Sequence, residues 1–187
     1  MAVAREDRAT DRLSASLAGL EAGMIAALWM LVWMGLSAVW RRSSFWTAEN
    51  LFATTFYGGS AIHSGFAAST LSGVALYLLV YSSLGCLFAS LVRVPPSGLR
   101  LVLLSILVAL GWYYLSFHLI WKRLSPLVTL LYAEEPTMLG HVIYGTVLAR
   151  FPKYLPKAAP TFPLELPAPA EVAESAAGPS DISAPLP

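Results

Sequence analysis

Two long uncharged segments constrain this chain more than any other feature of its sequence. Residues 22–40 and 101–121 contain no Asp, Glu, Lys or Arg, and as a helix each is long enough to cross a hydrocarbon core of about 30 Å. Soluble domains carry about 25% charged residues, whereas this chain has 12% charged and 57% hydrophobic residues. The sequence therefore predicts an all-α integral membrane protein and excludes an ordinary soluble enzyme or a disordered chain.

Two further membrane spans are expected from the rest of the apolar sequence. Residues 51–92 carry no formal charge but are too long for one helix, and the cluster Gly58-Gly59-Ser60 divides them. Residues 136–151 begin at a proline and stop before another. They are long enough to cross a thin or locally thinned membrane. The alternative is a re-entrant segment. The predicted fold is a bundle of four transmembrane helices at about 18–40, 66–92, 99–121 and 136–151.

Aromatic residues gather around one predicted face of the membrane. Residues 45–57 are rich in Phe, Trp and Tyr and only mildly polar, which is typical of a short helix lying in the outer membrane interface. The first and third spans both end in Trp followed by two basic residues. These residues are expected to be interfacial anchors: Trp40, Arg41, Arg42, Trp121, Lys122 and Arg123.

Basic residues also predict the orientation of the chain. More Lys and Arg flank the spans on the side of the N-terminus than on the other side, and the basic side normally faces the cytoplasm. We therefore expect a cytoplasmic segment 1–17 that is not a cleaved signal peptide and a four-helix membrane domain 18–151. Residues 152–187, rich in proline and acidic, are expected to be a disordered cytoplasmic tail. The plan is similar to that of small multi-span proteins of the bacterial inner membrane.

Three histidines fall on the same predicted side of the membrane and are the candidate cofactor ligands. Tyr114 and His118 are four residues apart and His141 and Tyr144 three apart, so each pair shares a helix face; His63 lies near the start of the second span. Such pairs can hold a quinone head group or a haem. The alternative is that they form interhelical hydrogen bonds worth about 0.6 kcal/mol each. No spacing within one helix predicts a metal site, and the sequence requires no cofactor.

Small residues at four-residue spacing mark the expected helix contacts. In lipid, such spacing lets two helix backbones approach closely, where packing replaces the hydrophobic effect. The expected packing residues are Gly19 and Gly23 in the first span, Ser69 and Gly73 in the second, and Gly145 and Ala149 in the fourth.

The remaining sequence features narrow the function mainly by exclusion. The 12 Lys and Arg against 11 Asp and Glu leave no basic field for nucleic acid, and a single cysteine excludes a disulfide framework. Nucleophile-elbow, phosphate-loop, zinc-protease and dinucleotide-binding motifs are absent, so no catalytic residue is predicted. The leading hypothesis is a non-catalytic accessory or assembly subunit of a larger membrane complex, such as an electron-transfer complex, whose partners are lipid and other membrane subunits. The alternatives are a quinone- or haem-linked redox protein and a small pore or lipid-handling protein.

Overall fold

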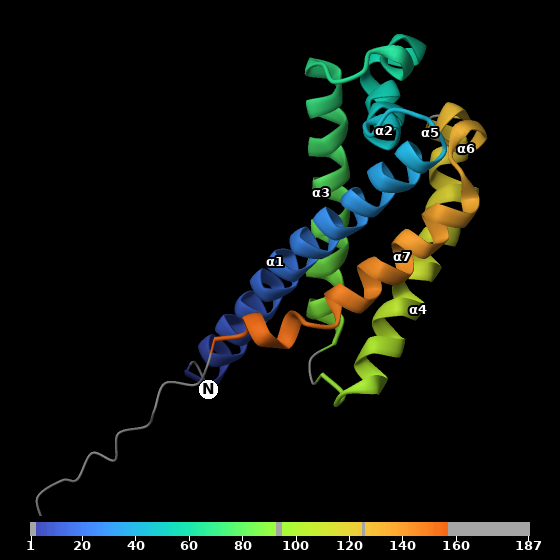
Figure 1. Cartoon of the computed structure of the whole chain (residues 1–187). Coiled ribbons are helices and arrows are strands. Elements are labelled where there is room, and N and C mark those ends of the chain that lie inside the picture. Colours follow the sequence, from blue (N-terminus) through green and yellow to red (C-terminus); the bar gives the residue numbers. More distant parts are fainter. Residues whose placement is uncertain (1–2, 93–94, 125, 157–187) are drawn as a thin grey trace, which may run out of the picture. The chain divides into compact units, whose positions relative to one another are not determined.

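The computed structural model describes residues 3–92, 95–124 and 126–156, all of whose regular structure is helical (Figure 1). The proline-rich tail predicted at 152–187 lies outside the described residues beyond Pro156. The helices in chain order are α1 (Val3–Trp40), α2 (Thr47–Tyr57), η1 (Gly58–His63), α3 (Ala68–Leu91), α4 (Leu99–Leu115), η2 (Ser116–Trp121), α5 (Lys122–Leu124), α6 (Pro126–Leu131), α7 (Glu134–Leu148) and η3 (Phe151–Tyr154).

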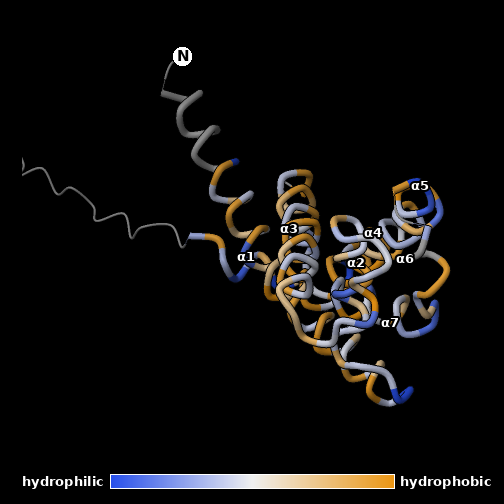
Figure 2. Tube along the Cα trace, turned by 90° about the horizontal axis from the view of Figure 1, so that it is seen from above, coloured by the Kyte–Doolittle hydropathy of each residue, from blue (hydrophilic) through white to orange (hydrophobic). Residues whose placement is uncertain are grey.

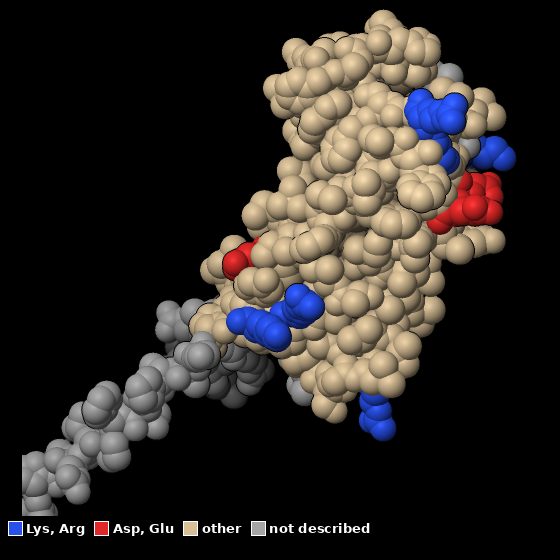
Figure 3. All heavy atoms as spheres, in the orientation of Figure 1, with Lys and Arg blue, Asp and Glu red and all other residues tan. Residues whose placement is uncertain are grey.

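Three helical segments are long and apolar enough to cross a membrane. They are Arg12–Trp40 in α1, Ala68–Leu91 in α3, and Leu99–Leu124, which runs from α4 through η2 into α5. Figure 3 shows Lys, Arg, Asp and Glu near the two ends of the bundle, with a broad uncharged band between them on the face drawn. Figure 2 shows hydrophobic residues along every long helix and strongly hydrophilic ones at α5. These features are compatible with an integral membrane protein.

Two helix boundaries differ from the sequence-based expectation. Helix α1 begins at Val3, so residues 3–17, within the segment predicted to be cytoplasmic, continue the first apolar segment as helix. Helix α7 has 15 residues, which corresponds to about 22 Å. That length is short of a full hydrocarbon core, so the fourth crossing stays a prediction.

Helix α1 occupies the middle of the bundle, between α3 and α7, and α4 packs on the other side of α7 (Figure 1). Gly19 and Gly23 on α1 face Gly85 on α3. A Cβ atom added at Gly85 would lie 2.5 Å from the Gly19 carbonyl oxygen and 2.6 Å from the Gly23 Cα. Because real Cβ atoms do not approach so closely, glycine is what allows the α1 and α3 backbones to touch.

The other predicted packing residues divide into two groups. A Cβ at Gly145 would lie 2.6 Å from the Ile106 Cα of α4, and one at Gly73 would meet the Glu49 carbonyl of α2. Ser69 instead bonds locally, with its Oγ 3.1 Å from Ser64 Oγ, and Ala149 is half-buried after α7. These glycine contacts join helices of this chain to one another, so they are not free for a partner.

Helix α2 is enclosed by protein on every side of its first two turns. All seven residues from Ala48 to Thr54 are buried, although an isolated amphipathic helix at an interface would bury only one face. The surrounding elements are α3, η1, α6 and α1. The expected helix at 45–57 is therefore present, but it covers one end of the bundle instead of lying flat on an outer surface.

Candidate functional site

The structure separates the three histidines that the sequence places on one side of the membrane. His63 in η1 and His118 in η2 are exposed, whereas His141 in α7 is fully buried. Tyr114 lies against His118, with ring centroids 4.6 Å apart, and is itself exposed. The outward-facing Tyr114–His118 pair and the buried His141 therefore occupy different environments, and no common ligand pocket joins them in the part of the chain that the structure describes.

His141 has hydrogen-bond partners at both ring nitrogens. Its Nδ1 lies 2.8 Å from the Thr137 carbonyl oxygen, which can only accept, so Nδ1 carries the proton. Its Nε2 lies 3.0 Å from the Tyr81 hydroxyl on α3, which therefore donates to it. A haem iron or a quinone oxygen at His141 would have to displace one of these two groups.

Tyr144, the other buried member of the predicted set, joins α7 to α3. Its hydroxyl donates to the Tyr81 carbonyl oxygen at 2.7 Å, and its side chain is fully buried. Together with the His141 bond, this contact fixes the depth of α7 relative to α3. The arrangement matches the alternative reading of these residues as interhelical hydrogen-bonding groups.

An aromatic cluster fills the interior between α2, α3, α4, η2 and α7. Phe52 of α2 stands edge-on to Tyr77 of α3 and Trp121 of η2, with ring centroids 5.4 and 4.9 Å away. Edge-to-face packing of this kind stabilises rings beyond their buried area. The members of the aromatic cluster are Phe52, Tyr77, Tyr81, Tyr113, Phe117, Trp121, Tyr132, His141 and Tyr144.

Trp121 corrects one expectation from the sequence. Predicted as an interfacial anchor, it is buried against Phe52, whereas Trp40 at the end of the first span is 88% exposed. The cause is the π-helical turn η2, which widens the helix and changes which residues face inward. Lys122 and Arg123, just beyond this turn, are exposed as expected, as are Arg41 and Arg42.

Glu49 is a buried acid that the sequence placed in a surface helix. Its side chain is 1% exposed, and its Oε2 atom has no hydrogen-bond partner. Burial raises the pKa of Glu49 from 4.5 to about 7, opposed in part by a backbone hydrogen bond. The available signal was its position as the one charged residue between Arg42 and Arg93, within a strongly aromatic stretch.

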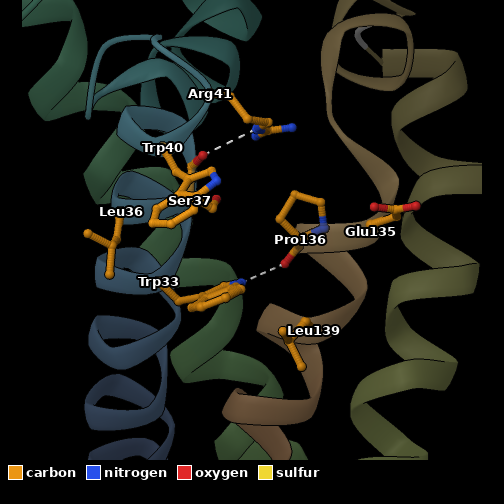
Figure 4. Close-up of a pocket in the computed structure, with 8 residues that line it drawn as sticks. All are labelled: Trp33, Leu36, Ser37, Trp40, Arg41, Glu135, Pro136 and Leu139. Atoms are coloured by element: carbon orange, nitrogen blue, oxygen red, sulfur yellow. Dashed lines mark hydrogen bonds between the residues drawn. The ribbon is translucent and has the colours of Figure 1, made fainter.

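A lateral groove of about 540 Å³ lies between the end of α1 and the start of α7 (Figure 4). Its lining is mainly apolar, and Trp33, Leu36 and Leu139 carry most of that character. One charged residue stands on each side: Arg41, in the turn just after α1, and Glu135 from α7. The complete lining is Trp33, Leu36, Ser37, Trp40, Arg41, Glu135, Pro136 and Leu139.

Hydrogen bonds fix the two walls of this groove. The Trp33 indole Nε1 donates to the Pro136 carbonyl oxygen at 2.8 Å, which ties α1 to α7. The Arg41 Nε donates to the Ser37 carbonyl oxygen at 3.2 Å, and Figure 4 shows its guanidinium extending toward α7 above Pro136. Hydrogen bonds therefore hold the groove in this shape and keep a cationic group at its upper edge.

Metal-binding groups of at least three His, Cys, Asp or Glu side chains are absent from the described residues. No protein-family model, curated protein or solved structure matches this chain. Its function is therefore inferred from the groove, the aromatic cluster and the buried acid alone.

Proposed function

We propose that this chain is a non-catalytic membrane protein that binds a phospholipid in the groove between α1 and α7. The proposal takes α7 as a fourth, thin crossing, both termini as cytoplasmic and the bacterial inner membrane as the location. The excess of basic residues on the N-terminal side of the spans supports this orientation. It places Arg41, and with it the groove, at the outer leaflet.

The groove carries the proposal because its size and chemistry fit one end of an amphiphile. Its volume of about 540 Å³ lies in the range of small-molecule sites, about 300–1,000 Å³. The apolar wall formed by Trp33, Leu36 and Leu139 suits an acyl chain. Arg41 suits a phosphate, since a guanidinium forms strong, forked hydrogen bonds with phosphate oxygens.

The charge of Glu135 determines which lipid head group we expect in the groove. A carboxylate at the α7 edge of the groove attracts an amine and repels a second anion, whereas Arg41 attracts the phosphate in either case. A zwitterionic lipid with a primary amine, such as phosphatidylethanolamine, satisfies both charges. We therefore expect phosphatidylethanolamine to be retained in preference to phosphatidylglycerol.

The test is native mass spectrometry of the protein purified in mild detergent with an equimolar mixture of the two lipids. Leu139→Trp, which fills the groove, is compared with Leu107→Trp on the exposed face of α4; Arg41→Gln is compared with Arg42→Gln. Loss of a charged hydrogen bond costs about 1.5–3 kcal/mol, so Arg41→Gln should weaken retention about tenfold or more. Equal lipid retention by Leu139→Trp and wild type would overturn the proposal.

A second candidate is the accessory subunit that the sequence suggests, and one observation favours it. A hollow of about 210 Å³ opens between α3 and α4, lined by Leu84, Leu87, Phe88, Leu91, Val92, Leu104 and Val108. An aliphatic side chain from the helix of another membrane subunit would fit this hollow, since packing drives helix association in lipid.

The native size of the protein, extracted from its own membranes in mild detergent, tests this second candidate. A subunit role would be supported if the wild-type protein migrates with a larger complex. Leu87→Trp should then disperse that complex, and Leu107→Trp should leave it intact. A species of the size of one chain would contradict a subunit role. The absorption spectrum and a quinone assay of the same preparation test the redox alternative, which predicts a chromophore or quinone that is lost on His118→Ala or His141→Ala.

A further inference from the structure

Two buried polar atoms next to the aromatic cluster have no hydrogen-bond partner: Glu49 Oε2 on α2 and the Tyr77 hydroxyl on α3. Both side chains are 1% exposed. Phe52, three residues after Glu49 on α2, packs edge-on against both Tyr77 and Tyr132, so the three polar groups lie around the same part of α2. An unpartnered buried polar group costs about 1–3 kcal/mol, so two of them together indicate that something is bound or exchanged there.

The charged and titratable groups around α2 limit what that can be. The titratable groups packed beside α2 are Tyr77 on α3 and Tyr132 just after α6. Arg41, just after α1, lines a hollow with Thr47, Leu51 and Tyr132, and His63 of η1 is exposed. No cation among the described residues therefore pairs with the Glu49 carboxylate.

A metal ion fits this place poorly. Calcium takes six to eight oxygen ligands and magnesium six in near-octahedral geometry. Among the described residues, Glu49 is part of no group of three or more metal-binding side chains, and the neighbouring hydroxyls are phenols. A proton needs one oxygen atom. It also turns the carboxylate, which only accepts hydrogen bonds, into a group that donates as well.

We propose that Glu49 and Tyr77 form a proton-binding site inside the bundle, covered by α2. The Glu49 carboxyl holds its proton while α2 is packed in place and releases it when water reaches the pair. The Tyr77 hydroxyl, which has no partner in the closed state, is the group that donates to the carboxylate once the proton has left. This site is independent of the lipid groove, since none of its residues lines that groove.

Hydrogen bonds between α2 and its neighbours define the closed state of this site. Asn50, next to Glu49, donates through Nδ2 to the Gly65 carbonyl oxygen at 2.8 Å, and its Oδ1 accepts from Thr70 Oγ1 at 2.7 Å. These bonds attach α2 to the segment before α3 and to the first turn of α3. They hold the side chain of Glu49 toward the interior, where a charge has the highest desolvation cost.

The experiment uses dicyclohexylcarbodiimide, an apolar reagent that reacts with protonated carboxyl groups in water-poor surroundings. The carboxyl O–H adds across one C=N bond of the reagent, the proton moves to nitrogen, and acyl transfer to nitrogen leaves a stable N-acylurea with no leaving group. Full-length protein in liposomes is treated at a series of pH values, and peptide mass spectrometry measures the adduct at each acid. Glu21 and Glu135, both exposed, are internal controls.

We expect the adduct at Glu49, in large excess over Glu21 and Glu135, with a yield that falls about tenfold per pH unit on the alkaline side of its midpoint. Glu49→Gln should abolish this adduct, and Tyr77→Phe should move the midpoint to higher pH because the carboxylate loses a donor. A Glu49 yield that does not change with pH would overturn the proposal, and an unmoved midpoint in Tyr77→Phe would overturn the pairing.

Infrared spectroscopy keeps the proposal falsifiable if the reagent does not reach the interior. A protonated carboxyl has a carbonyl band distinct from that of a carboxylate. The wild-type protein should show a pH-dependent band that Glu49→Gln lacks and Glu135→Gln keeps. Identical bands in wild type and Glu49→Gln at acidic pH would show that Glu49 holds no proton.

Discussion

The Tyr81 hydroxyl on α3 lies 3.0 Å from Nε2 of His141 on α7. Because Nδ1 of the same ring donates to the Thr137 carbonyl oxygen, the imidazole is held in one orientation. The bond joins two helices that both pack against α1 but whose backbones make little contact with each other. It is therefore a side-chain link across the interior of the bundle.

Removing this link should destabilise the protein measurably. Tyr81→Phe keeps the ring but leaves His141 Nε2 buried without a donor, which costs about 1–3 kcal/mol. Tyr114→Phe is the matched control, since Tyr114 is 67% exposed and faces outward beside His118. The free energy of unfolding in detergent is the measurement. Equal values for the two variants would show that the Tyr81–His141 bond contributes nothing.

The close approach of α1 and α3 predicts a sharp contrast between two glycines. Gly85→Leu places a side chain where a Cβ would already lie 2.5 Å from Gly19 O, so the helices must separate. We expect a loss of about 1–3 kcal/mol or more, as for other overpacked cores. Gly111→Leu on α4 is the control, because nothing lies within 4 Å of a Cβ there.

Size-exclusion profiles and thermal unfolding of the two glycine variants check this contrast. Gly85→Leu should unfold at a lower temperature or aggregate, and Gly111→Leu should behave as wild type. If both variants match wild type, α1 and α3 do not pack through these glycines. Gly19 and Gly23 contact Gly85 of the same chain. If Gly19→Leu or Gly23→Leu no longer co-purified with a partner protein, the cause would therefore be misfolding and not the loss of a subunit contact.

Burial of Glu49 predicts a stability that falls as pH rises. Its pKa is about 7 in the folded protein against 4.5 for an ordinary glutamate, so the folded state binds the proton more tightly. Below about pH 4.5 both states are protonated and no penalty applies. Between about 4.5 and 7 the penalty grows, reaching about 3 kcal/mol above pH 7.

Unfolding free energies of wild type and Glu49→Gln at several pH values test this prediction. The difference between the two proteins should widen in favour of Glu49→Gln as pH rises through this window. Glu135→Gln serves as the control for the loss of an exposed acid. Parallel pH profiles for wild type and Glu49→Gln would mean that Glu49 is not desolvated.

The long apolar helices were predictable because a lipid environment imposes a simple demand on sequence. A helix that crosses the hydrocarbon core needs a long uncharged run, and the segments around 22–40 and 101–121 have one; both lie within helices of the required length. The cluster Gly58-Gly59-Ser60 predicts a break in the run 51–92, and α2 ends just before Gly58, which has a positive φ of 62°. Glycine adopts that conformation without a steric penalty.

The environment of the polar residues was not predictable in the same way. His118 and His141 are alike in sequence terms, each near the end of an apolar segment, yet one is exposed and the other fully buried. The π-helical turn η2 rotates its residues, His118 among them, relative to an ideal helix. Ideal helical spacing therefore assigns the residues of η2 to the wrong helix faces. That turn also places Trp121 inward.

Hydropathy and charge act locally along each segment, so the long apolar helices of this chain follow from its residues alone. The enclosure of α2 and the burial of Glu49 follow from packing, because burial depends on which elements surround a helix, here α3, η1, α6 and α1. Residues far apart in the chain set that environment, and no window of sequence contains it.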